Sequence, residues 1–190
     1  MKLLKQVLGI DVAQKELVVT LGRLSDDLTI DLYAYNVFKN TESGFLKLSQ
    51  WVEKLTQKDI KVRYVMEATG VYHQKFAYYL DERQADLSIV LPNKISNYMR
   101  TLEIKTITDK TCSEGIARFG LERKLDNWKR PKEIYRILKQ LTRERRQITD
   151  ERTIAKNQLH AEQSEAIPHI SSIERLKKRI QFLNTLEKEI

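Results

Sequence analysis

Two acidic residues each close a short apolar run, a position from which a carboxylate can do chemistry. Residues 7–10 have the apolar character of a buried strand and end at Asp11. Residues 62–66 are rich in β-forming side chains and end at Glu67. Ligands of α/β sheets gather at strand ends, so both carboxylates are candidates for a site. Either acid alone is more often a turn or loop residue, and it is their pairing that favours a catalytic role.

A third acid, Asp109, lies at the start of a segment with helical spacing. Thr108 or Asp109 could cap a helix that runs to about Gly120, and capping is the ordinary structural role of such residues. Positions 109 and 112 are three apart and share a helix face, so Cys112 is expected beside Asp109. The next residue, Ser113, is expected to be a helix-surface residue.

Clustered carboxylates of this kind predict a divalent cation. Like charges repel at short range unless a cation compensates them, and Mg²⁺ prefers oxygen ligands while keeping several waters. A pair of such ions can stabilise both the attacking and the leaving oxygen in phosphoryl transfer. The single cysteine excludes a disulfide framework and a structural zinc cluster. We therefore expect Asp11, Glu67 and Asp109 to hold Mg²⁺ or Mn²⁺.

The elements that would position these acids follow an α/β order. Alternating apolar residues predict strands over 17–21 and 30–34, and the linkers near 12–15 and 22–27 are short enough for hairpins. A helix is predicted next, with apolar positions at helical spacing and capping residues before it. Its apolar positions are Phe45, Leu48, Val52 and Leu55, and its capping residues are Asn40 and Thr41.

A second helix, with Tyr72, Phe76 and Leu80, and a short strand over 87–91 closed by Pro92 complete this part. Three antiparallel strands followed by α/β units are the order of the ribonuclease H-like fold, a mixed sheet with flanking helices. The actin-like ATPase fold begins in the same way, so the order alone does not fix the chemistry.

Beyond Pro131 the pattern is helical, with two apolar stripes separated by Pro168. These stripes predict two long helices, packed as an antiparallel hairpin or across a dimer seam. We expect two domains, a catalytic one over 1–125 and a basic helical extension over 126–190.

The net charge of +8 is concentrated in one segment. Residues 123–156 carry 12 Lys and Arg against 5 Asp and Glu, whereas residues 1–122 carry 17 against 16. Such a block suits a polyanion, because each neutralised phosphate releases counterions, although a solvated helix face is an equal alternative. The candidate nucleic-acid contacts are Lys129, Arg130, Arg143, Arg145, Arg146 and Arg152. Trp128 and Tyr135 could stack on bases, but such aromatic residues more often pack.

Four motifs together resemble the DEDD transposases of insertion-sequence family 110, which are related to the Piv and MooV invertases. They are GIDVA at 9–13, MEATGVY at 66–72, LPNKISNYMRTLEIKTITDK at 91–110 and GIARFG at 115–120. The resemblance implies a RuvC-type nuclease domain that uses four acidic residues and a divalent metal to cut and join DNA strands. It also implies a second, C-terminal domain with a serine nucleophile, and some members are guided by a structured RNA.

Carried over by position, the first three acids of this family fall on Asp11, Glu67 and Asp109. The fourth, normally the second Asp of a TDxxDA motif, falls on Cys112. A neutral thiol does not replace a carboxylate, and Glu114 lies about 200° around a helix from position 112. The site is therefore expected to be altered or to work with three acids and water. The chain ends within a helical pattern, and we expect a fragment that lacks the serine domain.

Two other functions remain open at this stage. One is a non-catalytic DNA- or RNA-binding and assembly module, self-associating through 134–190. The other is an actin-like ATPase, which usually needs a second glycine-rich phosphate loop, whereas this chain has six glycines. No run approaches the roughly 18 apolar residues of a membrane span, so we expect a bacterial cytoplasmic protein associated with the nucleoid.

Overall fold

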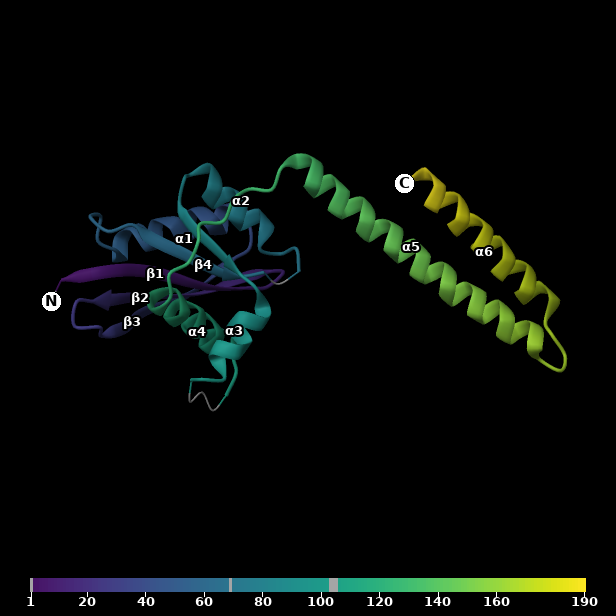
Figure 1. Cartoon of the computed structure of the whole chain (residues 1–190), viewed down its shortest axis with the longest axis horizontal. Coiled ribbons are helices and arrows are strands. Elements are labelled where there is room, and N and C mark those ends of the chain that lie inside the picture. The colour runs from purple at the N-terminus through teal and green to yellow at the C-terminus, as the bar shows by residue number, and fades with distance from the viewer. Residues whose placement is uncertain (1, 69, 103–105) are drawn as a thin grey trace. The chain divides into compact units, whose positions relative to one another are not determined.

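The chain forms two units, Met1–Arg130 and Pro131–Ile190, in a computed structural model that describes residues 2–68, 70–102 and 106–190 (Figure 1). The border lies beyond the expected division at residue 125, because the following residues still belong to the first unit. Ser88 Oγ donates a hydrogen bond to Asp126 O at 2.9 Å, and Trp128 N donates to Leu87 O at 2.7 Å. Trp128 packs on the core of the first unit, so packing rather than an open stacking surface is its role here.

A five-stranded mixed sheet organises the first unit. Its strands are β1 (Leu3–Val12), β2 (Glu16–Ser25), β3 (Ile30–Lys39), β4 (Val62–Glu67) and β5 (Asp86–Val90). They lie in the order β3-β2-β1-β4-β5, in which β2 is antiparallel to both β1 and β3, and β4 is parallel to both β1 and β5. This order and the flanking helices make the fold ribonuclease H-like, as predicted. The linker predicted over 22–27 begins too early in the chain, because residues 22–25 continue β2.

Helices cover both faces of this sheet. The helices α1 (Glu42–Leu55) and α2 (Gln74–Glu82) lie on one face, and α3 (Pro92–Met99) and α4 (Asp109–Glu122) lie on the other (Figure 1). Tyr72 precedes α2 instead of belonging to it. The helix α3 was not predicted from the sequence. Pro92 starts that helix, because its fixed φ suits the first helical turn.

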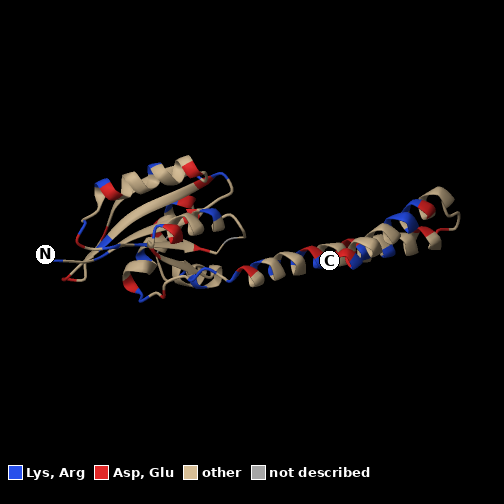
Figure 2. Cartoon of the chain, turned by 90° about the horizontal axis from the view of Figure 1, so that it is seen from above, with Lys and Arg blue, Asp and Glu red and all other residues tan. Residues whose placement is uncertain are grey.

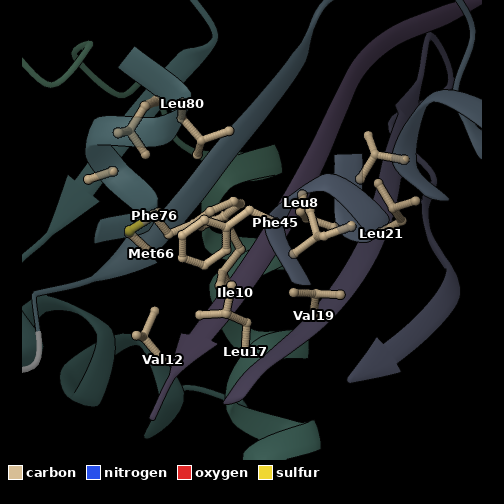
Figure 3. Packing of buried hydrophobic residues seen from close by; sticks show 14 residues of the cluster. Leu8, Ile10, Val12, Leu17, Val19, Leu21, Phe45, Met66, Phe76 and Leu80 are labelled. Carbon is tan, nitrogen blue, oxygen red and sulfur yellow. The ribbon is translucent and has the colours of Figure 1, made fainter. Parts of the chain in front are cut away.

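Alternation along β1 divides the core into two layers. Figure 3 shows Leu8 and Ile10 on the side of Phe45 and Phe76, which come from α1 and α2. Val7 packs instead in the second layer, with residues of α3 and α4. Because successive strand side chains point to opposite faces, positions 7, 9 and 11 of β1 all face α4.

The second unit is a hairpin of α5 (Glu133–Ser164) and α6 (Ile170–Glu189) (Figure 1). Ile148, Ala155 and Leu183 are buried between the two helices, which confirms the packing of the two stripes within one chain. Among the described residues, no helix is both long and apolar enough to cross a membrane.

Only part of the predicted stripe on α5 is buried. Glu187, close to the end of α6, forms an ion pair with Arg145, so α5 continues past its partner toward its own N-terminus. On that overhang Ile134, Leu138 and Leu141 are 58%, 51% and 39% exposed.

Candidate active site

Asp11 and Glu67 stand at matching positions on adjacent parallel strands. Ile10 of β1 pairs with Met66 of β4, and the two acids are the next residues on each strand. Because Ile10 and Met66 pack toward α1 and α2, both acids face the opposite side, where α4 lies. Ala68 N donates to Val90 O at 2.9 Å, which extends the ladder past Glu67 and fixes its backbone.

The helix α4 rests directly on β1 at Gly9. A Cβ at position 9 would come within 3.0 Å of backbone atoms of both Ser113 and Ala117, closer than real Cβ atoms approach other atoms. The missing side chain is therefore what lets the helix backbone reach the strand. Gly9 precedes Asp11 by two residues on the same face, so the contact places the first turns of α4 beside that acid.

Ser113 is a buried contact residue, and its expected place on the helix surface is wrong. Its side chain is fully buried, and its Oγ lies 2.7 Å from Thr20 Oγ1. Thr20 pairs with Gly9 across the β1–β2 ladder, so this hydrogen bond fixes the register of α4 at the same point. Helical spacing alone did not reveal this, because a serine in the second turn suits either surface or interior.

Thr108, and not Asp109, is the N-cap of α4. Its side chain accepts a hydrogen bond from Thr111 N at 3.2 Å, and Thr108 N donates to Thr111 Oγ1 at 2.8 Å. Asp109 is the first residue of the helix, so its carboxylate is not needed for capping. Its remaining local role is the favourable interaction of an acid with the N-terminus of a helix.

Burial and the charges of the other two acids both act on Asp11. Burial, followed by the charges of Asp109 and Glu67, raises the pKa of Asp11 from 3.8 to about 6. Burial and the same three acids also raise the pKa of the Cys112 thiol. All four positions carried over from the family are thus electrostatic neighbours at one edge of the sheet, and Cys112 is held in its neutral thiol form.

The donor chemistry fits a hard divalent cation, because carboxylate oxygens crowded against one another gain from a positive charge between them. As the chain stands, no group of three His, Cys, Asp or Glu side chains among the described residues is arranged to hold a metal ion. The acids are therefore clustered but not closed around a preformed cage.

Asn40 is a site residue that sequence reasoning took only for a capping residue. Its Nδ2 donates to Ala13 O at 2.9 Å and to Tyr72 O at 3.2 Å. Ala13 follows the strand of Asp11 and Tyr72 follows the strand of Glu67, so one side chain joins the two loops behind the acids. An asparagine before a helix gives no signal for such a bridge, because both partners are distant backbone carbonyls.

Most of the candidate nucleic-acid contacts already have partners within their own unit. Arg145 and Arg152 form ion pairs with Glu187, Arg146 pairs with Asp150, and Arg130 lies 3.9 Å from Asp81 and over the Tyr78 ring. Figure 2 shows acidic and basic residues interspersed along α5 and α6. The positive balance of the segment is therefore partly neutralised locally. Lys129 and Arg143 are exposed residues.

The family motifs surround this edge of the sheet. GIDVA forms the end of β1 and the turn that follows, MEATGVY follows from β4 into the loop before α2, and GIARFG lies in α4. Thr69 and residues 103–105, which belong to two of the motifs, lie outside the described residues.

Comparison with known proteins agrees with these motifs. A family model described as a transposase, DEDD_Tnp_IS110, matches residues 8–168. The pilin gene-inverting protein of Moraxella lacunata is 29% identical over 154 residues, covering 78% of this chain and 46% of that protein. Its counterpart in Moraxella bovis is 32% identical over 121 residues, covering 61% and 37%. The chain thus spans less than half the length of either relative.

Solved structures with related folds include nucleases. RuvC of Thermus thermophilus is 11% identical with a TM-score of 0.46, covering 65% of this chain and 99% of that one. The yeast mitochondrial Holliday junction resolvase is 16% identical with a TM-score of 0.40, covering 60% and 77%. These likenesses are too weak to bear on function. The family match, which spans most of the chain, is decisive, and the chain belongs to the DEDD transposases of the IS110 type.

Proposed function

We propose that this chain is the catalytic part of a transposase or site-specific recombinase that cuts and joins DNA strands, with Asp11, Glu67 and Asp109 as its acidic site. The observation that carries the proposal is the register of β1 and β4, which sets Asp11 and Glu67 side by side on the sheet face covered by α4, the helix that begins at Asp109. Burial, followed by the charges of Asp109 and Glu67, raises the pKa of Asp11. Three carboxylates from distant parts of the sequence crowd one sheet edge at an energetic cost, which a structural role does not explain.

The metal that suits this site is Mg²⁺, or Mn²⁺ in its place. Magnesium is commonly held by one or two carboxylates and keeps several waters, so a cage of three protein ligands is not required. Asp11 and Glu67, fixed on adjacent strands, would be the first ligands, and Asp109 would be the third. A bound ion would supply a positive charge that polarises a phosphate oxygen and activates the attacking hydroxyl or water. The chain itself keeps Asp11 and Glu67 partly out of water on adjacent strands and presents Asp109 from the first turn of α4.

Cys112 is the weak member of this site. Its protonated thiol is a soft, neutral group and does not ligate a hard cation well. We propose that water takes the place of the fourth carboxylate, so that the metal is held less tightly than by four acids.

The partner of the site is DNA, and the named relatives are pilin gene-inverting proteins. We infer that the protein acts on chromosomal DNA in the cytoplasm, within the nucleoid. Guidance by a structured RNA and a serine nucleophile in a further domain would extend the same chemistry. Lys129, Arg130, Arg143, Arg145, Arg146 and Arg152 are the proposed basic contacts.

A second role, self-association through the helical unit, has its own support. The overhang of α5 exposes an apolar stripe that α6 does not cover, including Ile134, Leu138 and Leu141. A second copy could bury these side chains. Sedimentation of Leu138→Glu is expected to show smaller species than the parent chain. Ile154→Glu, at an equally exposed α5 position (52% exposed) beside α6, is the control and should leave the assembly unchanged. Equal sedimentation of both variants and the parent would contradict this role.

The catalytic proposal is tested by metal binding and strand cleavage together. Mn²⁺ titration followed by electron paramagnetic resonance should show binding to the parent chain and little to Asp11→Asn. Asp59→Asn, at an exposed position outside the site, removes the same charge and should leave binding intact. Full-length protein that carries Asp59→Asn should still recombine DNA, whereas full-length protein that carries Asp11→Asn should not. Normal recombination by Asp11→Asn would overturn the proposal.

A further inference from the structure

A basic hollow lies at the end of the sheet opposite the acids. The cavity, of about 280 Å³, is lined by the start of β1, the segment that enters β4, the start of β5 and the end of α4. Lys5 and Asp11 lie six residues apart along β1, so this hollow and the acidic edge are separated by about 20 Å of extended strand. No residue of the acidic site lines it.

The charge of this hollow is strongly one-sided. Its charged lining residues are Lys5, Lys61, Arg63, Arg123, Lys124 and Asp86. Five cations thus face one carboxylate among the described residues that line it, whereas the first 122 residues as a whole are nearly balanced. Cations gathered from three separate segments repel one another, and an anion between them relieves that repulsion.

Buried hydrogen bonds hold the segment that carries Lys61. The side chain of Gln6 is 2% exposed, and its Nε2 donates to Gln57 O at 2.9 Å and to Ile60 O at 2.7 Å. Its Oε1 accepts from Gln57 N at 2.8 Å. A buried glutamine whose amide is used on both sides fixes a loop in place. Lys61, the next residue after Ile60, is therefore presented from a rigid backbone.

The other side of the hollow is held just as firmly. Arg63 donates to Ser88 Oγ at 2.8 Å and to Asn127 Oδ1 at 2.7 Å, both neutral acceptors, and its cross-strand partner Asp86 is the one carboxylate of the lining. The C-terminus of α4 contributes a partial negative charge to this region. Lys5 Nζ offsets that charge by donating to Leu121 O at 2.9 Å and Arg123 O at 3.4 Å. The partial negative charge of the helix C-terminus therefore offsets less of the positive charge of Arg123 and Lys124, which follow the helix directly.

We propose that this hollow binds the phosphodiester backbone of a nucleic acid, at a segment distinct from the one that meets the acids. The chemistry it selects is that of closely spaced phosphates, because two pairs of cations, Lys61 with Arg63 and Arg123 with Lys124, flank a space large enough for a phosphate group. The distance of about 20 Å from Asp11 means that the bound phosphate belongs to a different nucleotide from the one at the acids. The inference rests on the proposed function only in taking the partner to be a polynucleotide.

The test compares two double variants of the full chain that lose the same charge. Lys61→Gln with Lys124→Gln alters the hollow, and Lys47→Gln with Lys54→Gln alters exposed positions on α1. Binding of a fluorescent DNA duplex and of an RNA hairpin is measured in EDTA over a range of salt concentrations. The hollow variant should bind on the order of tenfold more weakly at low salt, with its log K against log salt slope reduced by about 2. The α1 variant should match the parent.

The arms of the experiment separate the sources of phosphate. If the hollow variant loses affinity only for DNA, or only for RNA, that polynucleotide is the one that occupies the hollow. Inorganic phosphate and chloride are compared as competitors of the polynucleotide at equal ionic strength. If phosphate competes no more strongly than chloride, the hollow recognises a phosphodiester backbone rather than a free anion. Equal binding by the hollow variant and the parent would overturn the inference, as would equal losses in both variants. Because EDTA removes metal, this binding assay tests the hollow alone. Mn²⁺ binding, measured separately, tests the proposed catalytic site, so the two failures can be told apart.

Discussion

The backbone of Ser113 lies against Gly9 so closely that no side chain fits between them. This contact brings α4 onto the central strand two residues before Asp11 and one turn after Asp109. The position of Asp109 relative to Asp11 is therefore set by a glycine and a helix backbone, whereas the β1–β4 pairing sets that of Glu67. Sheet and helix act as one rigid frame, and the carboxylates are carried on it.

Gly9→Ala is expected to separate α4 from β1. The added methyl group meets backbone, which cannot swing aside, so overpacking should lower the free energy of unfolding by about 1–3 kcal/mol or more. Metal affinity should fall as well, because Asp109 moves with the helix. Gly22→Ala is a matched control, since there the new Cβ meets the flexible ends of Leu32 and Leu121. Urea unfolding and Mn²⁺ titration give both readouts, and equal effects of the two variants would contradict the role of Gly9.

Asp11→Asn should stabilise the metal-free chain while removing its response to metal. In the folded chain the pKa of Asp11 is about 6, against 3.8 without these neighbours. Between those values the folded chain binds more protons than the unfolded chain, so the contribution of Asp11 to stability falls as the pH rises. Above about pH 6 the ionised group costs on the order of 1 kcal/mol after allowance for solvent screening.

The measurement for Asp11 is the difference in unfolding free energy between parent and variant, followed from about pH 4 to pH 7 in EDTA. The advantage of the variant should grow over that interval and disappear when Mn²⁺ is added to the parent. A difference that stays flat with pH would show that Asp11 is not crowded by the other acids.

Cys112→Asp should raise the affinity for metal and lower the stability of the metal-free chain. A fourth carboxylate adds a hard ligand, and without metal it adds repulsion to Asp11, Glu67 and Asp109. Cys112→Ser, which keeps a small neutral side chain, should change neither property by much. Calorimetric titration with Mn²⁺ and thermal unfolding in EDTA are the two measurements. Unchanged Mn²⁺ affinity in Cys112→Asp would place position 112 outside the metal site.

Asn40→Ala should weaken the site without touching an acid. The loss of hydrogen bonds to Ala13 O and Tyr72 O is expected to cost about 1–2 kcal/mol and to free the loops behind both acids. Hydrogen exchange should speed up in those two loops, with a lower Mn²⁺ affinity. Asn36→Ala removes only a local hydrogen bond to Val37 N and should spare both. Unaltered exchange in the loops of Asn40→Ala would exclude a positioning role.

Arg152→Gln and Arg143→Gln should have different effects in the helical unit. Arg152 is largely buried and paired with Glu187, so its loss should loosen the hairpin, whereas Arg143 is exposed. If both arginines bind DNA as proposed, both variants should lower DNA affinity, but only Arg152→Gln should also lower helix content on heating. Circular dichroism and DNA titration distinguish the two outcomes, and a loss of helix stability in Arg143→Gln alone would contradict this assignment.

The sequence determined those features that depend on residues close together in the chain. Alternating apolar residues predicted the antiparallel strands, the acids stood at strand ends, and the spacing after Thr108 predicted α4, because such patterns repeat every two or every three to four residues. Motif order also identified the family correctly, because four short motifs at the right spacing are specific together.

The tertiary structure alone decided which of these residues meet. The burial of Ser113 against Thr20, the bridge from Asn40 to two loops and the pairing of Arg145 and Arg152 with Glu187 join residues far apart in the chain. Local spacing carries no record of such partners, because contacts of this kind depend on how strands and helices stack. The charge of the 123–156 segment was visible in the sequence, but its neutralisation within the hairpin was settled by packing.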